Sequence, residues 1–79
     1  MIKFFTASWC TPCSILKNNL SVEDLEGVIL VDVDTQRGEV DKYGVKSVPT
    51  LIKFGEDGEE LNRLSGSMTR DQFLGFKGG

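Results

Sequence analysis

The 79-residue sequence contains no histidine and only two cysteines, Cys10 and Cys13. Protein zinc sites are tetrahedral and take three or four ligands, most often from these two residue types. Zinc binding within one chain is therefore disfavoured, and only a site shared between chains stays open. No metal site is predicted.

The sequence also has no cluster of basic residues. Its nine Lys and Arg residues are scattered, and twelve Asp and Glu residues give a net charge of -3. Nucleic acid is disfavoured as a partner, because its binding requires a concentrated basic surface. With 39% hydrophobic and 27% charged residues, the composition is typical of a globular domain and not of a disordered or membrane-bound chain.

Neither a leader segment nor an internal boundary is visible. No charged segment precedes an apolar stretch and a small-residue cleavage site, so no signal peptide is expected and the cytoplasm is the expected location. There is no repeat, low-complexity segment or linker, so residues 1–79 are expected to form a single domain. A domain of this size buries only about two thirds of its unfolded surface, and we expect modest stability.

The two cysteines stand three residues apart in the run Ser8-Trp9-Cys10-Thr11-Pro12-Cys13. The preceding segment 2–7 is short and rich in Phe and Ile, which predicts a strand, and Leu16 and Leu20 follow at helical spacing. Pro12 suits the first turn of a helix, where its missing N–H costs little. The dithiol is therefore predicted to lie where a strand turns into a helix.

This placement predicts redox chemistry. The free amide groups and positive dipole end at a helix start favour a thiolate, so Cys10 is the expected nucleophile toward a partner disulfide and Cys13 the resolving thiol. A purely structural disulfide is one alternative, although such a short loop would constrain the unfolded chain very little. Two unrelated buried thiols are another, disfavoured by the adjoining Trp9, Thr11 and Pro12.

The rest of the sequence predicts alternating strands and helices. The β-branched segment 28–34 reads as a strand, apolar on both faces at its start like parallel strands between helix layers. A connector at 18–27 precedes it, and a short helix at 37–43 follows, ended by Gly44 as a left-handed cap.

Two antiparallel strands and a helix complete the prediction. Strands at 50–54 and 59–65 are joined by the hairpin turn Gly55-Glu56-Asp57-Gly58. The capping box Thr69-Arg70-Asp71-Gln72 starts a C-terminal helix that packs its aromatic residues on the sheet, and residues 77–79 are expected to fray. The predicted order is β-α-β-α-β-β-α.

At this point the sequence resembles the thioredoxin family over nearly its whole length. The segment 7–13 is similar to the family's Trp-Cys-Gly-Pro-Cys motif, with Thr11 in place of Gly. Asp34 follows, and the stretch 43–51, Tyr-Gly-Val-Lys-Ser-Val-Pro-Thr-Leu, resembles the one that holds the family's cis-proline. Gly66 falls near the glycine that precedes the family's last helix.

The resemblance implies a minimal thioredoxin fold of the α/β class, with a four-stranded mixed sheet of order 2-1-3-4 flanked by helices. It also implies that Pro49 is cis and stacked on the dithiol, and that the Val48 backbone binds a partner as an added strand. A trans proline that starts a strand is the alternative. Trp9 is expected in an exposed contact surface and not in the core. The expected substrate-binding residues are Trp9, Thr11, Pro12, Val48, Pro49 and Gly66.

Two positions depart from the family together. Phe4 stands where thioredoxins usually keep a buried Asp, and Leu30 where a Lys often accompanies it. Losing both charges is compatible with an apolar core, whereas losing one would leave the other uncompensated. We hypothesise that Cys13 has no carboxylate base beside it and resolves mixed disulfides more slowly near neutral pH.

The family's first strand and helix have no counterpart, which gives dimensions closer to a glutaredoxin. The strand at 28–34 is then expected at a sheet edge, where an apolar strand invites pairing. Asp32 and Asp34 counteract this, and a monomer at low concentration with weak self-association is predicted.

The expected function is cofactor-free dithiol–disulfide exchange. The chain would reduce disulfides of cytoplasmic enzymes such as ribonucleotide reductase and be reduced by a thioredoxin reductase. One alternative is a glutaredoxin-like protein that draws electrons from glutathione, although the sequence shows no clear Lys or Arg pair for a glutathione carboxylate. A binding subunit without turnover is another, and it would not need Cys13.

Overall fold

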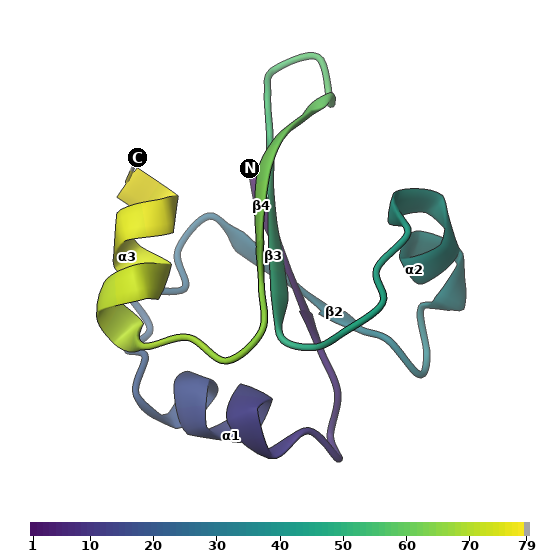
Figure 1. Cartoon of the computed structure of the whole chain (residues 1–79). Coiled ribbons are helices and arrows are strands. Elements are labelled where there is room, and N and C mark those ends of the chain that lie inside the picture. The colour runs from purple at the N-terminus through teal and green to yellow at the C-terminus, as the bar shows by residue number, and fades with distance from the viewer. Residues whose placement is uncertain (79) are drawn as a thin grey trace.

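The computed structural model describes residues 1–78, and its elements follow the predicted order β-α-β-α-β-β-α (Figure 1). The strands and helices are β1 (Ile2–Thr6), α1 (Thr11–Asn18), β2 (Val28–Asp32), α2 (Arg37–Tyr43), β3 (Thr50–Phe54), β4 (Glu60–Ser65) and α3 (Arg70–Gly78). No helix in this part of the chain is long and apolar enough to span a lipid bilayer.

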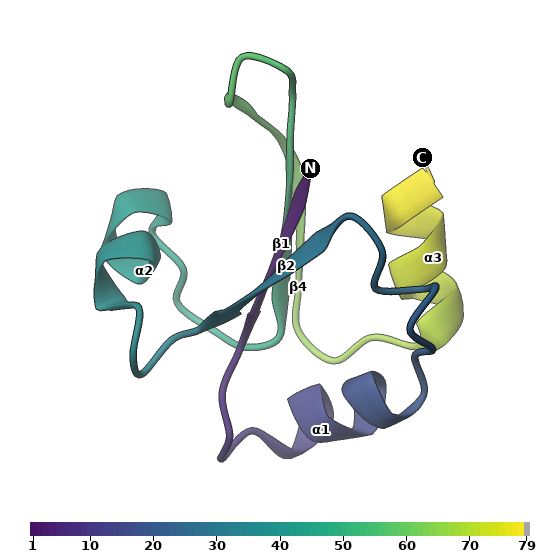
Figure 2. The same ribbon diagram turned by 180° about the vertical axis from the view of Figure 1, so that it is seen from behind.

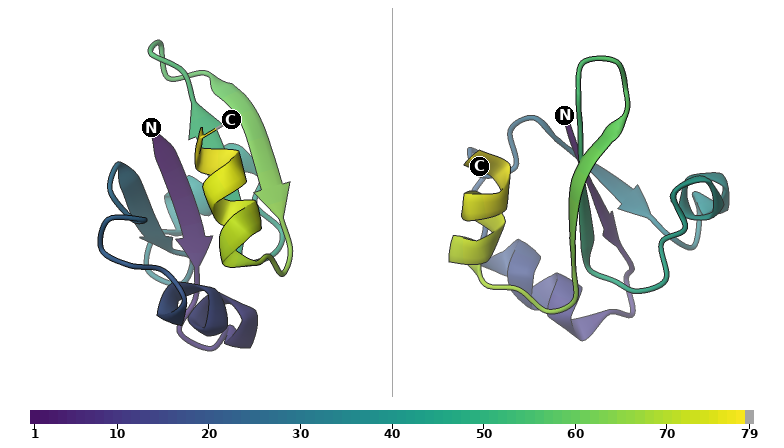
Figure 3. Two further views of the ribbon diagram at one scale, coloured as in Figure 1. Left: turned by 90° about the vertical axis from the view of Figure 1, so that its left-hand side faces the viewer. Right: turned by 45° about the horizontal axis from the view of Figure 1, so that its top comes forward.

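The four strands form one mixed sheet in the order β2-β1-β3-β4, which confirms the predicted order (Figure 3). β1 runs parallel to β2 and antiparallel to β3, and β3 and β4 form an antiparallel hairpin. β1 is therefore a central strand, and the chain passes from its C-terminal end into α1.

Alternating side chains of β1 build two separate cores on the two faces of the sheet. Phe4 packs with residues of α1 and α3, Leu16 and Phe73, whereas Phe5 packs on the other face with the group that includes Tyr43 of α2. Figures 1 and 2 show α3 and α2 on opposite sides of the sheet. Both Phe side chains are fully buried, and each stabilises the fold by about 2–3 kcal/mol through loss of apolar surface.

Several predicted boundaries shift by one or two residues. β1 ends at Thr6 and β4 begins at Glu60. β2 ends at Asp32 and not at Asp34, because the Asp32 carboxylate accepts the Asp34 N–H at 2.8 Å and turns the chain there.

The predicted fraying after residue 76 is wrong for the described residues. α3 continues through Gly78, and the Lys77 ammonium donates to the Asp24 carbonyl at 2.8 Å. This contact fixes the last turn of α3 to the connector before β2.

β2 lies at the sheet edge, as the order 2-1-3-4 predicted, so its comparison with strands between helix layers is wrong. Ile29 and Leu30 are 45% and 46% exposed, because β2 is an edge strand whose only partner in the sheet is β1. Leu30 is aligned with Phe4 across the two strands. The prediction that both residues belong to an apolar core is therefore confirmed for Phe4, which is fully buried, and wrong for Leu30, which is half-exposed.

Candidate active site

Cys10 is the N-cap residue of α1, as the sequence predicted. Its backbone is extended, and its Sγ accepts the N–H of Cys13 at 3.3 Å. Pro12 lies in the first turn, where its missing N–H removes no helical hydrogen bond. The sulfur of Cys10 therefore faces the free amide end of the helix, the environment that stabilises a thiolate.

Cys10 and Cys13 form a disulfide, with their Cα atoms 5.3 Å apart. This excludes two unrelated thiols. Cys13 has no exposed surface and lies with Leu16 on the inward side of α1, whereas the intervening Thr11 and Pro12 are exposed. Cys10 is also buried but keeps 4% of its surface exposed, so a partner would meet it before Cys13.

The loop before β3 covers the disulfide. The Val48–Pro49 peptide bond is cis, as the resemblance implied, and the alternative of a trans proline is wrong. The carbonyl oxygen of Val48 lies 3.6 Å from Sγ of Cys10. The Gly66 N–H donates to the Pro49 carbonyl at 3.0 Å, and Gly66 has a φ of 93°, which side chains other than that of glycine rarely adopt.

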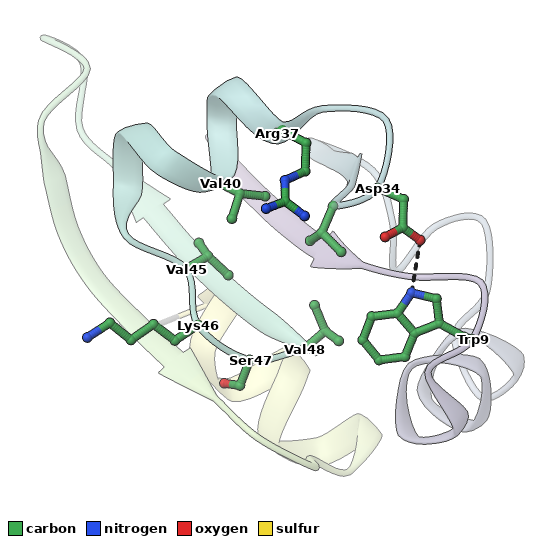
Figure 4. A pocket seen from close by; sticks show the side chains of 9 residues that line it. Trp9, Asp34, Arg37, Val40, Val45, Lys46, Ser47 and Val48 are labelled. Carbon is green, nitrogen blue, oxygen red and sulfur yellow. Dashed lines mark hydrogen bonds between the residues drawn. The ribbon is translucent and has the colours of Figure 1, made fainter.

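Trp9 is 66% exposed, which confirms that its side chain lies at the surface and not in the core. Its indole Nε1–H donates to Oδ2 of Asp34 at 2.9 Å (Figure 4). Asp34 lies in the turn after β2, so this bond holds the indole beside the Val48 loop. The sequence analysis included Asp34 among the residues that resemble the family, but it did not predict this hydrogen bond to Trp9.

A hollow of about 240 Å3 opens between Trp9, α2 and the Val48 loop (Figure 4). Its apolar lining comes from the indole and from valines of three segments. Arg37, Lys46 and Ser47 also line it, and sequence reasoning had selected none of them. Lys46 and Ser47 lie in the 43–51 motif next to Val48, which could have indicated them, whereas no local pattern indicates Arg37, because α2 meets Trp9 only in the folded chain.

No carboxylate within residues 1–78 is hydrogen-bonded to Cys13. The position at which thioredoxins carry the Asp is filled by Phe4, which is fully buried among Leu16, Leu51 and Phe73. When Cys13 resolves a mixed disulfide, its thiol must then give its proton to another acceptor, such as water or the partner.

The comparisons with known proteins agree with this geometry. The thioredoxin family model matches residues 1–76. A thioredoxin of Chlamydia caviae is 38% identical over 78 positions, covering 94% of this chain and 74% of the relative. A thioredoxin of Staphylococcus aureus is 35% identical over 72 positions, covering 85% and 68%.

The solved structures show the same fold. A mutant thioredoxin from Halobacterium salinarum superposes with a TM-score of 0.79 at 34% identity, covering 95% of this chain and 68% of that one. With the disulfide at the helix start and the cis-proline loop beside it, the chain belongs to the thioredoxin family and is a disulfide oxidoreductase that acts through Cys10 and Cys13.

Proposed function

We propose that this protein carries electrons to disulfide-containing proteins of the cytoplasm, with ribonucleotide reductase among its targets, and that a thioredoxin reductase reduces it again. Two observations support a direction of attack: Cys10 keeps a small exposed surface of 4% whereas Cys13 has none, and Cys10 is the residue at the helix start. Cys13 is enclosed, whereas Cys10 caps the helix beside the exposed indole of Trp9. An incoming disulfide can approach Cys10 from the side of the Val48 loop.

The proposed reaction consists of two exchanges. The Cys10 thiolate attacks one sulfur of the partner disulfide, forms a mixed disulfide and releases the other partner sulfur as a thiolate. Cys13, as its thiolate, then attacks Sγ of Cys10 and releases the second partner sulfur. Two electrons pass to the partner, and the protein ends as the observed Cys10–Cys13 disulfide.

The residues around the disulfide are proposed to hold the partner chain. The Val48 carbonyl is beside Sγ of Cys10, so a partner segment paired with the Val48 backbone would present its sulfur to Cys10. Trp9, Thr11, Pro12, Pro49 and Gly66 would complete the contact surface. We further propose that residues 1–79 act as one monomeric domain.

Trapping of the mixed disulfide tests this function. A Cys13→Ser variant, reduced and mixed with an oxidised protein substrate, should accumulate a covalent complex that a reductant releases, because the resolving thiol is missing. A Cys10→Ser variant is the matched control and should form almost none. Equal trapping by both variants would contradict the assigned roles, and turnover without Cys13 would contradict the two-step exchange.

A further inference from the structure

In the hollow beside the active site, the charged group of Arg37 points inward and has no partner among residues 1–78. Of the other charged residues that line the hollow, Asp34 accepts a hydrogen bond from the Trp9 indole. The ammonium of Lys46 points away from the hollow (Figure 4). Arg37 projects from α2 past Val40 into the hollow (Figure 4). Its guanidinium makes no hydrogen bond or ion pair with any residue of 1–78.

The positive charge of Arg37 is opposite in sign to the net charge of the whole molecule. The chain carries a net charge of -3, so its average field repels anions. The hollow differs from this average, because the Arg37 guanidinium points into it and the carboxylate that lines it, that of Asp34, already accepts the Trp9 indole N–H. An unpaired guanidinium beside an apolar surface presents a planar set of donors that matches a carboxylate.

We infer that Arg37 selects partner segments that carry an Asp or Glu side chain close to the cysteine under attack. This inference rests on the function proposed above, and it names the class of segment that the same site prefers. The occupant is an extended protein segment, because the hollow runs from Trp9 along the Val48 loop to Val45. Its apolar side chains would cover the valines, and its carboxylate would pair with Arg37.

The test compares two peptides that differ only in charge. Both are symmetric disulfides of one short sequence with a single Cys, flanked on both sides by Glu in one peptide and by Gln in the other. The reduced full-length protein is mixed with each peptide at low ionic strength, and the second-order rate constant of reduction is measured by chromatography of acid-quenched samples. We expect the Glu peptide to react about threefold faster than the Gln peptide, the size typical of a partly exposed ion pair.

Two variants isolate the position of the charge. Arg37→Gln should lower the ratio of the two rate constants to about one or below and leave the Gln peptide unaffected. Lys42→Gln removes the same charge from α2, but Lys42 stacks over the Tyr43 ring and does not line the hollow. This control should keep the threefold ratio. Added salt should reduce the ratio in the wild type.

The outcomes separate this inference from the proposed function. Reduction of neither peptide would contradict the proposed function itself. Reduction of both at equal rates by the wild type would overturn only the role of Arg37. An equal loss of preference in Arg37→Gln and Lys42→Gln would also overturn it, because the net charge would then be the cause. Glutathione disulfide serves as a third substrate, and an effect of Arg37→Gln seen only with it would also overturn the inference, because the preferred ligand would then be a small disulfide and not a protein segment.

Discussion

Phe4 changes the chemistry expected beside Cys13, although it lies within the hydrophobic core. In the thioredoxin family, the resemblance places an Asp at this position, where it assists proton transfer at the resolving thiol. Here the position is a fully buried aromatic ring, packed at a centroid distance of 6.1 Å from Phe73. Compared with the family pattern, the site has both cysteines and the cis-proline loop, but it has Phe4 in place of the carboxylate base.

A Phe4→Asp variant should resolve the mixed disulfide faster near neutral pH, because a buried carboxylate can accept the Cys13 proton. It should also lower the free energy of unfolding by about 3–5 kcal/mol, through lost packing and an unpaired polar group. Stopped-flow release of a reduced partner from the mixed disulfide measures the first effect, and urea denaturation the second.

Phe4→Asn is the matched control, because it has the same size and no basic carboxylate. A double variant with Leu30→Lys places a cation on the neighbouring strand, in register with residue 4, and should recover part of the stability. If Phe4→Asp and Phe4→Asn resolve the mixed disulfide at the same rate, the absence of the carboxylate does not limit this step.

Thr6 provides a second test at the scale of one residue. Its hydroxyl Oγ1 is buried and has no hydrogen-bond partner among residues 1–78. A Thr6→Val substitution keeps the shape and removes the unpaired group, so it should raise the free energy of unfolding by about 1 kcal/mol. The comparison is Thr50→Val, because the Thr50 hydroxyl donates to the Ser47 carbonyl at 2.7 Å. This second variant should be destabilised, and urea denaturation of both should give opposite signs.

Between elements, the connector before β2 is tied to α3 by an ion pair. The Arg70 guanidinium donates to both carboxylate oxygens of Asp24, at 2.9 and 3.2 Å. The Ser21 N–H donates to the same carboxylate. The hydrogen bond from Arg70, followed by that from Ser21, lowers the pKa of Asp24 from 3.8 to about 2.

This lowered pKa predicts a loss of stability in acid. A carboxyl with a lower pKa in the folded than in the unfolded state stabilises the fold above its unfolded pKa, and this contribution is lost as the pH falls through the folded value. The wild type should therefore exceed Asp24→Asn in free energy of unfolding above about pH 4, and the difference should shrink between about pH 4 and 2. Arg70→Gln should show the same trend. Urea denaturation at several pH values measures it, and a difference constant with pH would contradict the prediction.

The order of elements could be predicted because each depends on local patterns. The Phe- and Ile-rich segment of β1, the capping box at Thr69 and the turn at 55–58 are patterns of a few residues. The capping box is confirmed by reciprocal hydrogen bonds between Thr69 and Gln72. The position of Cys10 at the helix start followed from local spacing, and the cis Pro49 followed from a motif of the family.

What could not be predicted depends on contacts between distant segments. Arg70 and Asp24 are 46 residues apart, and nothing in either segment indicates the other. The hollow around Arg37 forms only when α2, the Val48 loop and Trp9 meet. The edge position of β2 followed from the strand order of the family, whereas the apolar run alone did not indicate the exposure of Ile29, because a buried strand and an uncovered edge strand can have the same pattern.

The whole molecule is compact, with a radius of gyration of 11.6 Å over its Cα atoms. This is close to the value of about 12 Å expected for a single domain of this length. The sheet has two edges of different character. β4 is the edge strand of a hairpin, whereas β2 exposes Ile29 and Leu30 on the two faces of the opposite edge.

The edge at β2 should allow weak self-association and no stable dimer. Its open backbone groups and half-exposed apolar residues favour pairing with a second copy, but the net charge of -3 on each copy opposes it. Sedimentation velocity should show a monomer in dilute solution and a concentration-dependent increase in mass only near about 1 mM, the range of weak contacts. Salt should strengthen the association by screening the repulsion.

Leu30→Lys should abolish the association at high concentration, because it places a charge in the middle of the pairing strand. The matched control is Leu61→Lys on β4, where the leucine is 60% exposed at the other edge of the sheet, and it should leave the association unchanged. A stable dimer of the wild type in dilute solution would show that the charge repulsion is too weak to keep the edge open. Loss of association in Leu61→Lys alone would place the contact at β4.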